Sequence, residues 1–198
     1  MVQIKNLKVY GLEESILRSG LPMRTKEPIE RKLDFKDYRR ARNLGNVKSG
    51  TGHDNFLKGI IVQFDLKYPQ YFTPQLQRYS WVDIVSSQSK MHCLTKGEFE
   101  YNKYVTPEIY EEFETYINEY NDFKENKIGE PYELFMKCIS NCPMGLEMWM
   151  GITTNYLQLK TIYKQRKNHK LEEDWGEFCS MIKQLPQSYL ITGDKNAL

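Results

Sequence analysis

The sequence lacks the features that define several classes of protein. None of its apolar runs approaches the roughly 20 residues that a membrane-spanning helix needs. Its first residues carry neither a signal peptide nor a lipid-anchor motif. Four cysteines among 198 residues are too few and too scattered to form a disulfide framework. Together these absences predict a soluble, cytoplasmic protein.

Metal ligands and phosphate-binding loops are also scarce. The three histidines are His53, His92 and His169. Cys138 and Cys142 lie four residues apart, but no histidine is placed in the sequence to complete a zinc site with them, so no metal site is predicted. The sequence contains no Walker A loop and no Gly-x-Gly-x-x-Gly run after a strand. The usual cradles for mononucleotides and dinucleotides are therefore excluded.

Neither positive nor negative charge is in large excess. The chain has 28 basic and 26 acidic side chains, a formal net charge of +2, and so has no overall field of the kind that holds a protein on nucleic acid. The basic stretches at 39–42 and 164–170 are typical of solvated helix faces. A nucleic-acid-binding module built on these stretches and on the tyrosines is therefore a disfavoured alternative.

The overall composition is that of one soluble domain spanning residues 1–198. Apolar residues make up 40% and charged residues 27%, close to the averages for globular proteins. Aromatic residues reach 13%, and tyrosine, with 14 copies, is the commonest of them. Because a tyrosine ring packs while its hydroxyl finds a partner, this composition favours pockets and subunit interfaces.

Hydrophobic periodicity and turn residues predict a mixture of strands and helices. Strands are expected at 2–10 and 59–67, a short helix from Pro74, and longer helices at 35–44, 107–125, 132–139, 154–166 and 172–185. Asp34 is the expected N-cap of the first long helix. The helix at 107–125 has an apolar stripe formed by Ile109, Phe113, Ile117, Tyr120 and Phe123. The helix at 172–185 has an apolar face formed by Trp175, Phe178, Cys179, Ile182 and Leu185. The C-terminal third, about 130–186, is predicted to be helical.

Several polar side chains form an ordered set along the chain. In order, they are Gly52-His53, Gln75, Arg78, a serine-rich stretch at 86–92, Asn155 and Arg166. Taken singly, His53 fits a turn cap, Arg78 a surface ion pair and Arg166 a solvated helix face. Serine-rich stretches are usually loops, although their hydroxyls and backbone N–H groups suit an anion or a nucleobase edge.

In order and spacing this set resembles the flavin-dependent thymidylate synthases of the ThyX type. That family has Gly-His before a strand, a helix leading into Arg-His-Arg with a Ser-x-Asn-Glu-x-Ser-x-Arg tail, and a late Asn-x-Arg-x-Leu segment whose helix closes on Leu-Arg. The corresponding segments here are Gly52-His53-Asp54-Asn55, Ile60–Leu66, Gln75-Leu76-Gln77-Arg78-Tyr79-Ser80, Ser86-Ser87-Gln88-Ser89-Lys90-Met91-His92, Asn155-Tyr156-Leu157-Gln158-Leu159 and Arg166. The resemblance spans roughly residues 34–185.

The resemblance implies a fold, a reaction and a site. The fold would be α/β (α+β), a curved sheet flanked by helices, in a homotetramer with active sites between subunits. The reaction would be reductive methylation of dUMP to dTMP with FAD, NADPH and methylenetetrahydrofolate, with Arg166 contacting the pyrimidine as the catalytic residue. The residues implied in substrate binding are Gln75, Arg78, Ser87, Gln88, Ser89 and Arg166. The residues implied near the flavin are His53, Asn55, Tyr79, Ser80, Asn155 and His169.

The Arg-His-Arg signature is altered in this chain. Arg78 is present, but Tyr79 and Ser80 stand where the histidine and second arginine are expected, and Ser87 stands where the tail has glutamate. Two hypotheses follow from the resemblance. The chain is either an enzyme of this type or a non-enzymatic nucleotide-binding protein that keeps the fold without the flavin and turnover.

Overall fold

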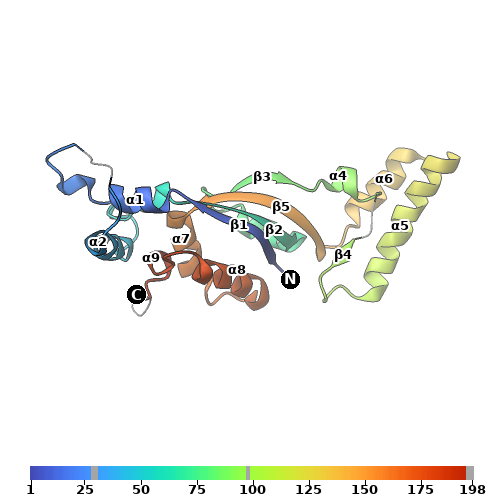
Figure 1. The fold of residues 1–198 in the computed structure, drawn as a ribbon. Helices are drawn as coiled ribbons and strands as arrows, with labels where there is room; N and C mark the ends of the chain where they lie inside the picture. The colour runs from blue at the N-terminus through green and yellow to red at the C-terminus, as the bar shows by residue number, and fades with distance from the viewer. Residues whose placement is uncertain (28–30, 97–98, 195–198) are drawn as a thin grey trace.

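The computed structural model describes residues 1–27, 31–96 and 99–194. One antiparallel sheet runs through the molecule, with helices below it and at both ends (Figure 1). The strand order is β1-β2-β5-β3, and the short β4 pairs with β5. The strands are β1 (Gln3–Tyr10), β2 (Ile61–Pro69), β3 (Asp83–Ser87), β4 (Glu100–Tyr101) and β5 (Leu146–Asn155). This architecture confirms the predicted fold class.

The helices are grouped around the sheet. At one end lie α1 (Leu12–Arg18) and α2 (Phe35–Gly45), at the other α5 (Pro107–Asn126) and α6 (Pro131–Ser140), and below it α7 (Tyr156–Arg166), α8 (Glu172–Gln184) and α9 (Tyr189–Thr192) (Figure 1). The shorter elements are α3 (Thr73–Leu76), α4 (Lys90–Cys93), and the 3-10 turns η1 (Leu21–Met23), η2 (Asn55–Gly59) and η3 (Gln70–Phe72). Of the helices in the described ranges, none is both long enough and apolar enough to cross a membrane.

Strand β5 corrects the prediction that residues 130–186 are helical. That prediction holds for α6, α7 and α8 but is wrong for Leu146–Asn155, and α7 begins at Tyr156 rather than at residue 154. Side chains of β5 alternate between buried and half-buried positions along the strand. Two methionines, a glycine and a glutamate lie in this stretch and are not typical strand formers. Pairing with β2 on one side and β3 on the other selects the strand despite this composition.

Other local predictions are confirmed. The Asp34 side chain accepts a hydrogen bond from the Asp37 backbone N–H at 3.0 Å, and Asp37 reciprocates in a capping box that starts α2. In α5, Phe113 and Ile117 are buried as the stripe predicts, but Ile109 is half exposed. The stripe therefore packs only in part, chiefly against α6, where the rings of Tyr120 and Phe135 lie 5.6 Å apart.

The hydrophobic core lies between the sheet and the helices below it. Phe64 of β2 packs against Phe178 of α8 with ring centroids 5.9 Å apart, and Trp175 of α8 packs against Phe72 at 4.5 Å. The opposite face of the sheet carries polar side chains, among them Lys5 and Asp65, which lie opposite each other on β1 and β2. The sheet is thus buried on one face and polar on the other, as the alternating pattern of β2 predicts.

Candidate functional site

Arg166 is the last residue of α7 and is the centre of a compact polar cluster. Its Nε donates to the Tyr79 hydroxyl at 2.6 Å, and its Nη1 donates to Gln75 Oε1 at 3.5 Å. Its guanidinium carbon lies 5.5 Å from the centroid of the Tyr79 ring and 4.7 Å from that of Trp175, within cation–π range. Two hydrogen bonds and two aromatic rings therefore hold the half-buried guanidinium in one place.

Gln75 and Tyr79 come from α3 and the segment that follows it. Proline at the start of α3 favours this short helix, as predicted. Tyr79 is buried, and its hydroxyl also donates to Gln165 Oε1 at 3.0 Å. Arg78 and Ser80 on either side of Tyr79 are exposed. The chain thus brings two of the predicted substrate residues, Gln75 and Arg166, into direct contact.

Trp175 belongs to this cluster although it was predicted only as part of the apolar face of α8. It is fully buried, and its indole Nε1 donates to Gln75 Oε1 at 3.0 Å. A buried tryptophan needs an acceptor for its N–H group, which is the one signal that could have marked it as a polar contact. Its partner could not be identified without the fold, because 100 residues separate the two.

His169 lies in the turn between α7 and α8, beside the same tryptophan. Its backbone N–H donates to the Arg166 carbonyl at 3.0 Å, and its Nδ1 accepts from the Leu171 backbone N–H at 3.1 Å. Partial burial lowers the pKa of His169, and the positive charges of Arg166 and Lys170 lower it further. The ring is therefore neutral at pH 7, with its proton on Nε2.

The predicted serine cluster lies elsewhere on the sheet. Ser87 ends β3, the backbone N–H of Gln88 donates to the Trp149 carbonyl at 2.9 Å, and Ser89 is the N-cap residue of α4. Gln88 Oε1 also accepts from the Trp149 backbone N–H at 2.9 Å. The stretch is thus a strand end and a helix start rather than a free loop. It borders a hollow of about 570 Å³ lined by Lys5, Asp65, Ser86, Ser87, Gln88, Trp149, Met150 and Gly151.

No hydrogen bond or ion pair in the described parts of the chain joins the serine cluster to the Arg166 cluster. Gln88 is bonded to Trp149, whereas Thr154 Oγ1 donates to the carbonyl of Trp81, two residues after Tyr79. Trp149 and Thr154 are five residues apart in β5, so their Cα atoms are separated by about 17 Å along the strand. Within the described residues, the two predicted halves of the nucleotide site are therefore not joined by a direct polar contact.

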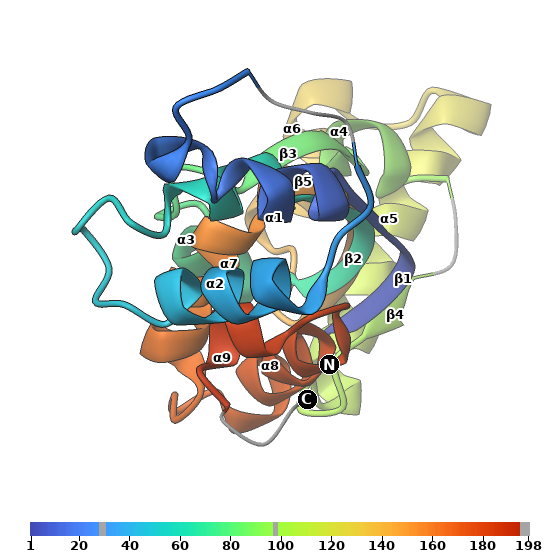
Figure 2. The same ribbon diagram turned by 60° about the vertical axis from the view of Figure 1, so that its left-hand side comes forward.

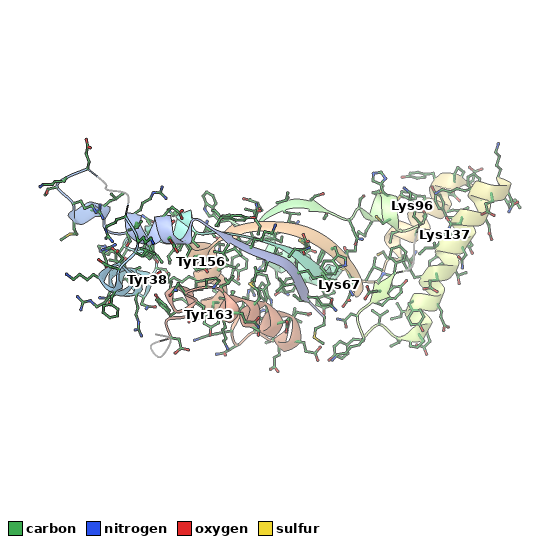
Figure 3. The ribbon with its side chains drawn as sticks, in the orientation of Figure 1. Tyr38, Lys67, Lys96, Lys137, Tyr156 and Tyr163 are labelled. Atoms are coloured by element: carbon green, nitrogen blue, oxygen red, sulfur yellow. The ribbon has the colours of Figure 1, made fainter. Side chains whose placement is uncertain are left out.

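The Gly-His segment is anchored to α7 by a buried ion pair that the sequence did not reveal. Asp54 Oδ2 accepts from Lys160 Nζ at 2.6 Å, and the same ammonium donates to the Val47 carbonyl at 2.9 Å. Both charged side chains are almost fully buried. Figure 2 shows the loop that precedes η2 beside α7. The neighbouring side chains of His53 and Asn55 are exposed to solvent.

The basic stretches contain residues that stabilise the fold. Arg40 Nη2 donates to Asp37 at 2.8 Å and its Nε donates to Ser19 at 3.1 Å, which links α2 to α1. Lys164 Nζ donates to Ser49 at 3.3 Å. These contacts give both stretches a role within the protein. Among the residues that the structure describes, no group of three histidine, cysteine or carboxylate side chains is placed to hold a metal ion.

Comparison with solved structures identifies the fold. No protein-family model and no curated protein sequence matches the chain. The flavin-dependent thymidylate synthase ThyX from Helicobacter pylori, complexed with FAD and dUMP, matches with a TM-score of 0.70 and 12% identity over 96% of this chain and 97% of that one. A UMP/dUMP methylase, PolB from Streptomyces cacaoi, bound with 5-Br dUMP, matches with a TM-score of 0.65 and 11% identity over 98% and 95%. The chain has the fold of the flavin-dependent thymidylate synthases.

Within this thymidylate synthase fold, the residues implied near the flavin differ in exposure and in their contacts. Asn155 is buried, and its Oδ1 caps α7 by accepting from the Gln158 backbone N–H at 2.9 Å. The Tyr79 hydroxyl is engaged with Arg166 and Gln165. His53, Asn55 and Ser80 are exposed at the surface. Some of the polar groups that the resemblance implies near the flavin, those of Tyr79 and Asn155, are therefore already engaged in hydrogen bonds within the fold.

Proposed function

We propose that the chain binds a pyrimidine nucleotide such as dUMP, with Arg166 contacting the base, and methylates it as a divergent enzyme of the thymidylate synthase fold. The observation that carries this proposal is the fixed guanidinium of Arg166 between Tyr79 and Trp175. Among the described residues, no protein acceptor bonds its Nη2. A rigid guanidinium with a free donor suits a ring carbonyl, and it stabilises negative charge that develops on the ring during methylation.

The proposed site draws on more than one copy of the chain. Within the described residues, no hydrogen bond or ion pair joins the serine cluster to Arg166. We therefore propose a homo-oligomer, in line with the homotetramer that the resemblance implies. In this arrangement Ser87, Gln88 and Ser89 of one copy bind the phosphate of a nucleotide whose base contacts Arg166 of another. A strictly monomeric mass by light scattering would contradict this arrangement.

The specific reaction we propose is reductive methylation of dUMP to dTMP, with FAD as cofactor and NADPH and methylenetetrahydrofolate as cosubstrates. Two solved structures of the same fold contain FAD and dUMP, which supports testing these reagents first. The contribution of this chain's own residues is to bind and orient the pyrimidine. We propose that Arg78, exposed beside Tyr79, adds a positive charge near the nucleotide.

The second candidate is a nucleotide-binding protein without flavin or turnover. The observation that favours it is the commitment of the Tyr79 hydroxyl to Arg166 and Gln165 at the place where the family has the histidine of its signature. The absorbance spectrum of the purified protein, taken before and after addition of FAD and dUMP, separates the two. Stoichiometric flavin and dTMP formation support the enzyme, whereas colourless protein that binds dUMP supports the second candidate.

The binding proposal is tested by calorimetric titration of dUMP into the wild type and into Arg166→Lys. Lysine keeps the charge but loses the planar fork, so dUMP affinity is expected to fall at least about tenfold. Arg39→Lys is the matched control, because Arg39 is exposed on α2, away from the Arg166 cluster, and its variant is expected to bind dUMP like the wild type. Equal affinity in all three proteins would contradict a role for Arg166.

A further inference from the structure

The side-chain amide of Gln75 is held in one of its two possible orientations. Its Oε1 accepts from the indole Nε1 of Trp175 at 3.0 Å and from Nη1 of Arg166 at 3.5 Å. An indole N–H and a guanidinium N–H can only donate hydrogen bonds. If the amide flipped, its NH₂ group would face two donors and both bonds would be lost. The oxygen of Gln75 must therefore face Trp175 Nε1 and Arg166 Nη1, and its Nε2 must point away from these two donors.

The polar groups that remain free at this cluster are donors. Within the described residues, neither Gln75 Nε2 nor Arg166 Nη2 has a protein acceptor, and both side chains are half-buried. The Tyr79 hydroxyl, which could accept from a ligand, already accepts from Arg166 and donates to Gln165. The acceptor nitrogen of His169 is engaged by the Leu171 N–H, which leaves a donor on its Nε2. A ligand at this cluster therefore meets N–H groups rather than acceptors.

We infer that Gln75, oriented by Trp175, makes this site select a pyrimidine with a carbonyl at ring position 4 over one with an amino group there. This inference rests on the proposed function, since it assumes that the base lies at Arg166. A uracil-type base presents an O4 acceptor, whereas a cytosine-type base presents an N4 amino donor. An amino group placed against the Gln75 and Arg166 donors would leave all of them unpaired, and a site rejects such a ligand strongly. Trp175 is a positioning residue, because it acts through Gln75.

Gln75→Glu is the sharpest variant, because glutamate has the same shape. One carboxylate oxygen keeps both inward hydrogen bonds, while the outward NH₂ donor is replaced by an acceptor oxygen. The fold is therefore expected to be retained. The affinity for dUMP is expected to fall at least about tenfold, and the ratio of dUMP to dCMP affinity is expected to shift toward dCMP.

Trp175→Phe tests the positioning role, because it keeps an aromatic ring and removes the indole donor. The Gln75 amide can then turn, so the ratio of dUMP to dCMP affinity is expected to fall at least about fivefold, with a smaller change in dUMP affinity itself. Tyr156→Phe is the matched control. It also removes one buried donor, the hydroxyl that bonds the Pro186 carbonyl at 2.6 Å, while it keeps the ring, and it is expected to leave the ratio unchanged.

The experiment compares dUMP, dCMP, deoxyuridine and inorganic phosphate by calorimetry on the wild type and the three variants. Preference for dUMP over dCMP in the wild type, lowered at least about fivefold in Trp175→Phe and shifted toward dCMP in Gln75→Glu, supports the inference. Equal binding of dUMP and dCMP, competed by inorganic phosphate, would show that the donors bind phosphate oxygens and would overturn it. Wild-type binding of dUMP with an unchanged ratio in both variants overturns the inference alone, whereas binding of no nucleotide overturns the proposed function as well.

Discussion

The Arg166 cluster and the serine cluster differ in how their polar side chains are used. Around Trp175, the side chains of Gln75, Tyr79 and Arg166 are bonded to one another and packed against the indole ring. Next to Trp149, the Ser87 hydroxyl is exposed and, within the described parts of the chain, has no protein partner. The Arg166 cluster, called the rigid end below, is preorganised by its own fold. The serine cluster, called the open end, is accessible to a ligand or a second chain. One half of a binding site can be rigid within a single chain, while the other half is completed only when two chains associate.

The largest effect is expected from breaking the anchor of the rigid end. Lys160→Met leaves the Asp54 carboxylate buried without its partner, so the free energy of unfolding is expected to fall by about 3–5 kcal/mol. Denaturant unfolding followed by circular dichroism measures this loss. The double variant Asp54→Leu/Lys160→Met is expected to recover much of it, because no buried charge is left unpaired. A loss below about 1 kcal/mol in the single variant would show that the pair is not buried in solution.

A smaller effect is expected from removing one hydrogen bond within the rigid end. Tyr79→Phe keeps the ring but deprives Arg166 Nε of its acceptor, which is expected to lower the free energy of unfolding by about 1–3 kcal/mol. The affinity for dUMP is expected to fall as Arg166 loses its fixed position. Tyr132→Phe, at an exposed tyrosine of α6, is the control for both measurements. Unchanged stability and affinity in Tyr79→Phe would mean that Arg166 is not positioned by this hydroxyl.

The rigid end is also expected to weaken in acid. The pKa of His169 is lower in the folded chain than its ordinary value near 6.5, so the unfolded chain binds more protons as the pH falls. Its contribution to stability is therefore complete above about pH 6.5 and is lost as the pH drops through the lower, folded pKa. The Asp37 carboxyl stays ionised in this window, because its hydrogen bond with Arg31 holds its pKa well below the usual range.

His169→Asn tests this pH dependence, because asparagine retains an acceptor for the Leu171 N–H but does not titrate. The melting temperature of the wild type is expected to fall more steeply between pH 7 and pH 5 than that of the variant. Parallel curves for the two proteins would show that His169 does not contribute to the pH dependence.

The smallest change in stability is expected at the open end. Ser87→Ala removes an exposed hydroxyl, so the free energy of unfolding is expected to change by less than about 0.5 kcal/mol. In the assembled protein the affinity for dUMP is nevertheless expected to fall several-fold. Loss of stability without loss of affinity would place Ser87 in the fold rather than in the site.

Local signals in the sequence predicted much of the fold. The Asp34 cap of α2 and the apolar face of α8, with Trp175 and Phe178, depend on neighbours along the chain and are confirmed. Strand β5 was missed because its identity depends on pairing with β2 and β3 rather than on its own composition. The fold resemblance was inferred from the order of polar residues and is matched by the solved structures.

The site was predictable only where the family pattern marked a residue. Gln75 and Arg166 were identified from their positions, and the structure places them in contact. Trp175 and the Asp54–Lys160 pair were missed, because their roles arise from contacts between residues 100 or more positions apart.

The most direct test of this account is a structure of the protein with bound dUMP. The account predicts that the uracil ring contacts Arg166 and Gln75 of one chain, while the phosphate lies at Ser87–Ser89 of another copy. A dUMP molecule that contacts only one chain, or that lies away from Arg166, would contradict it.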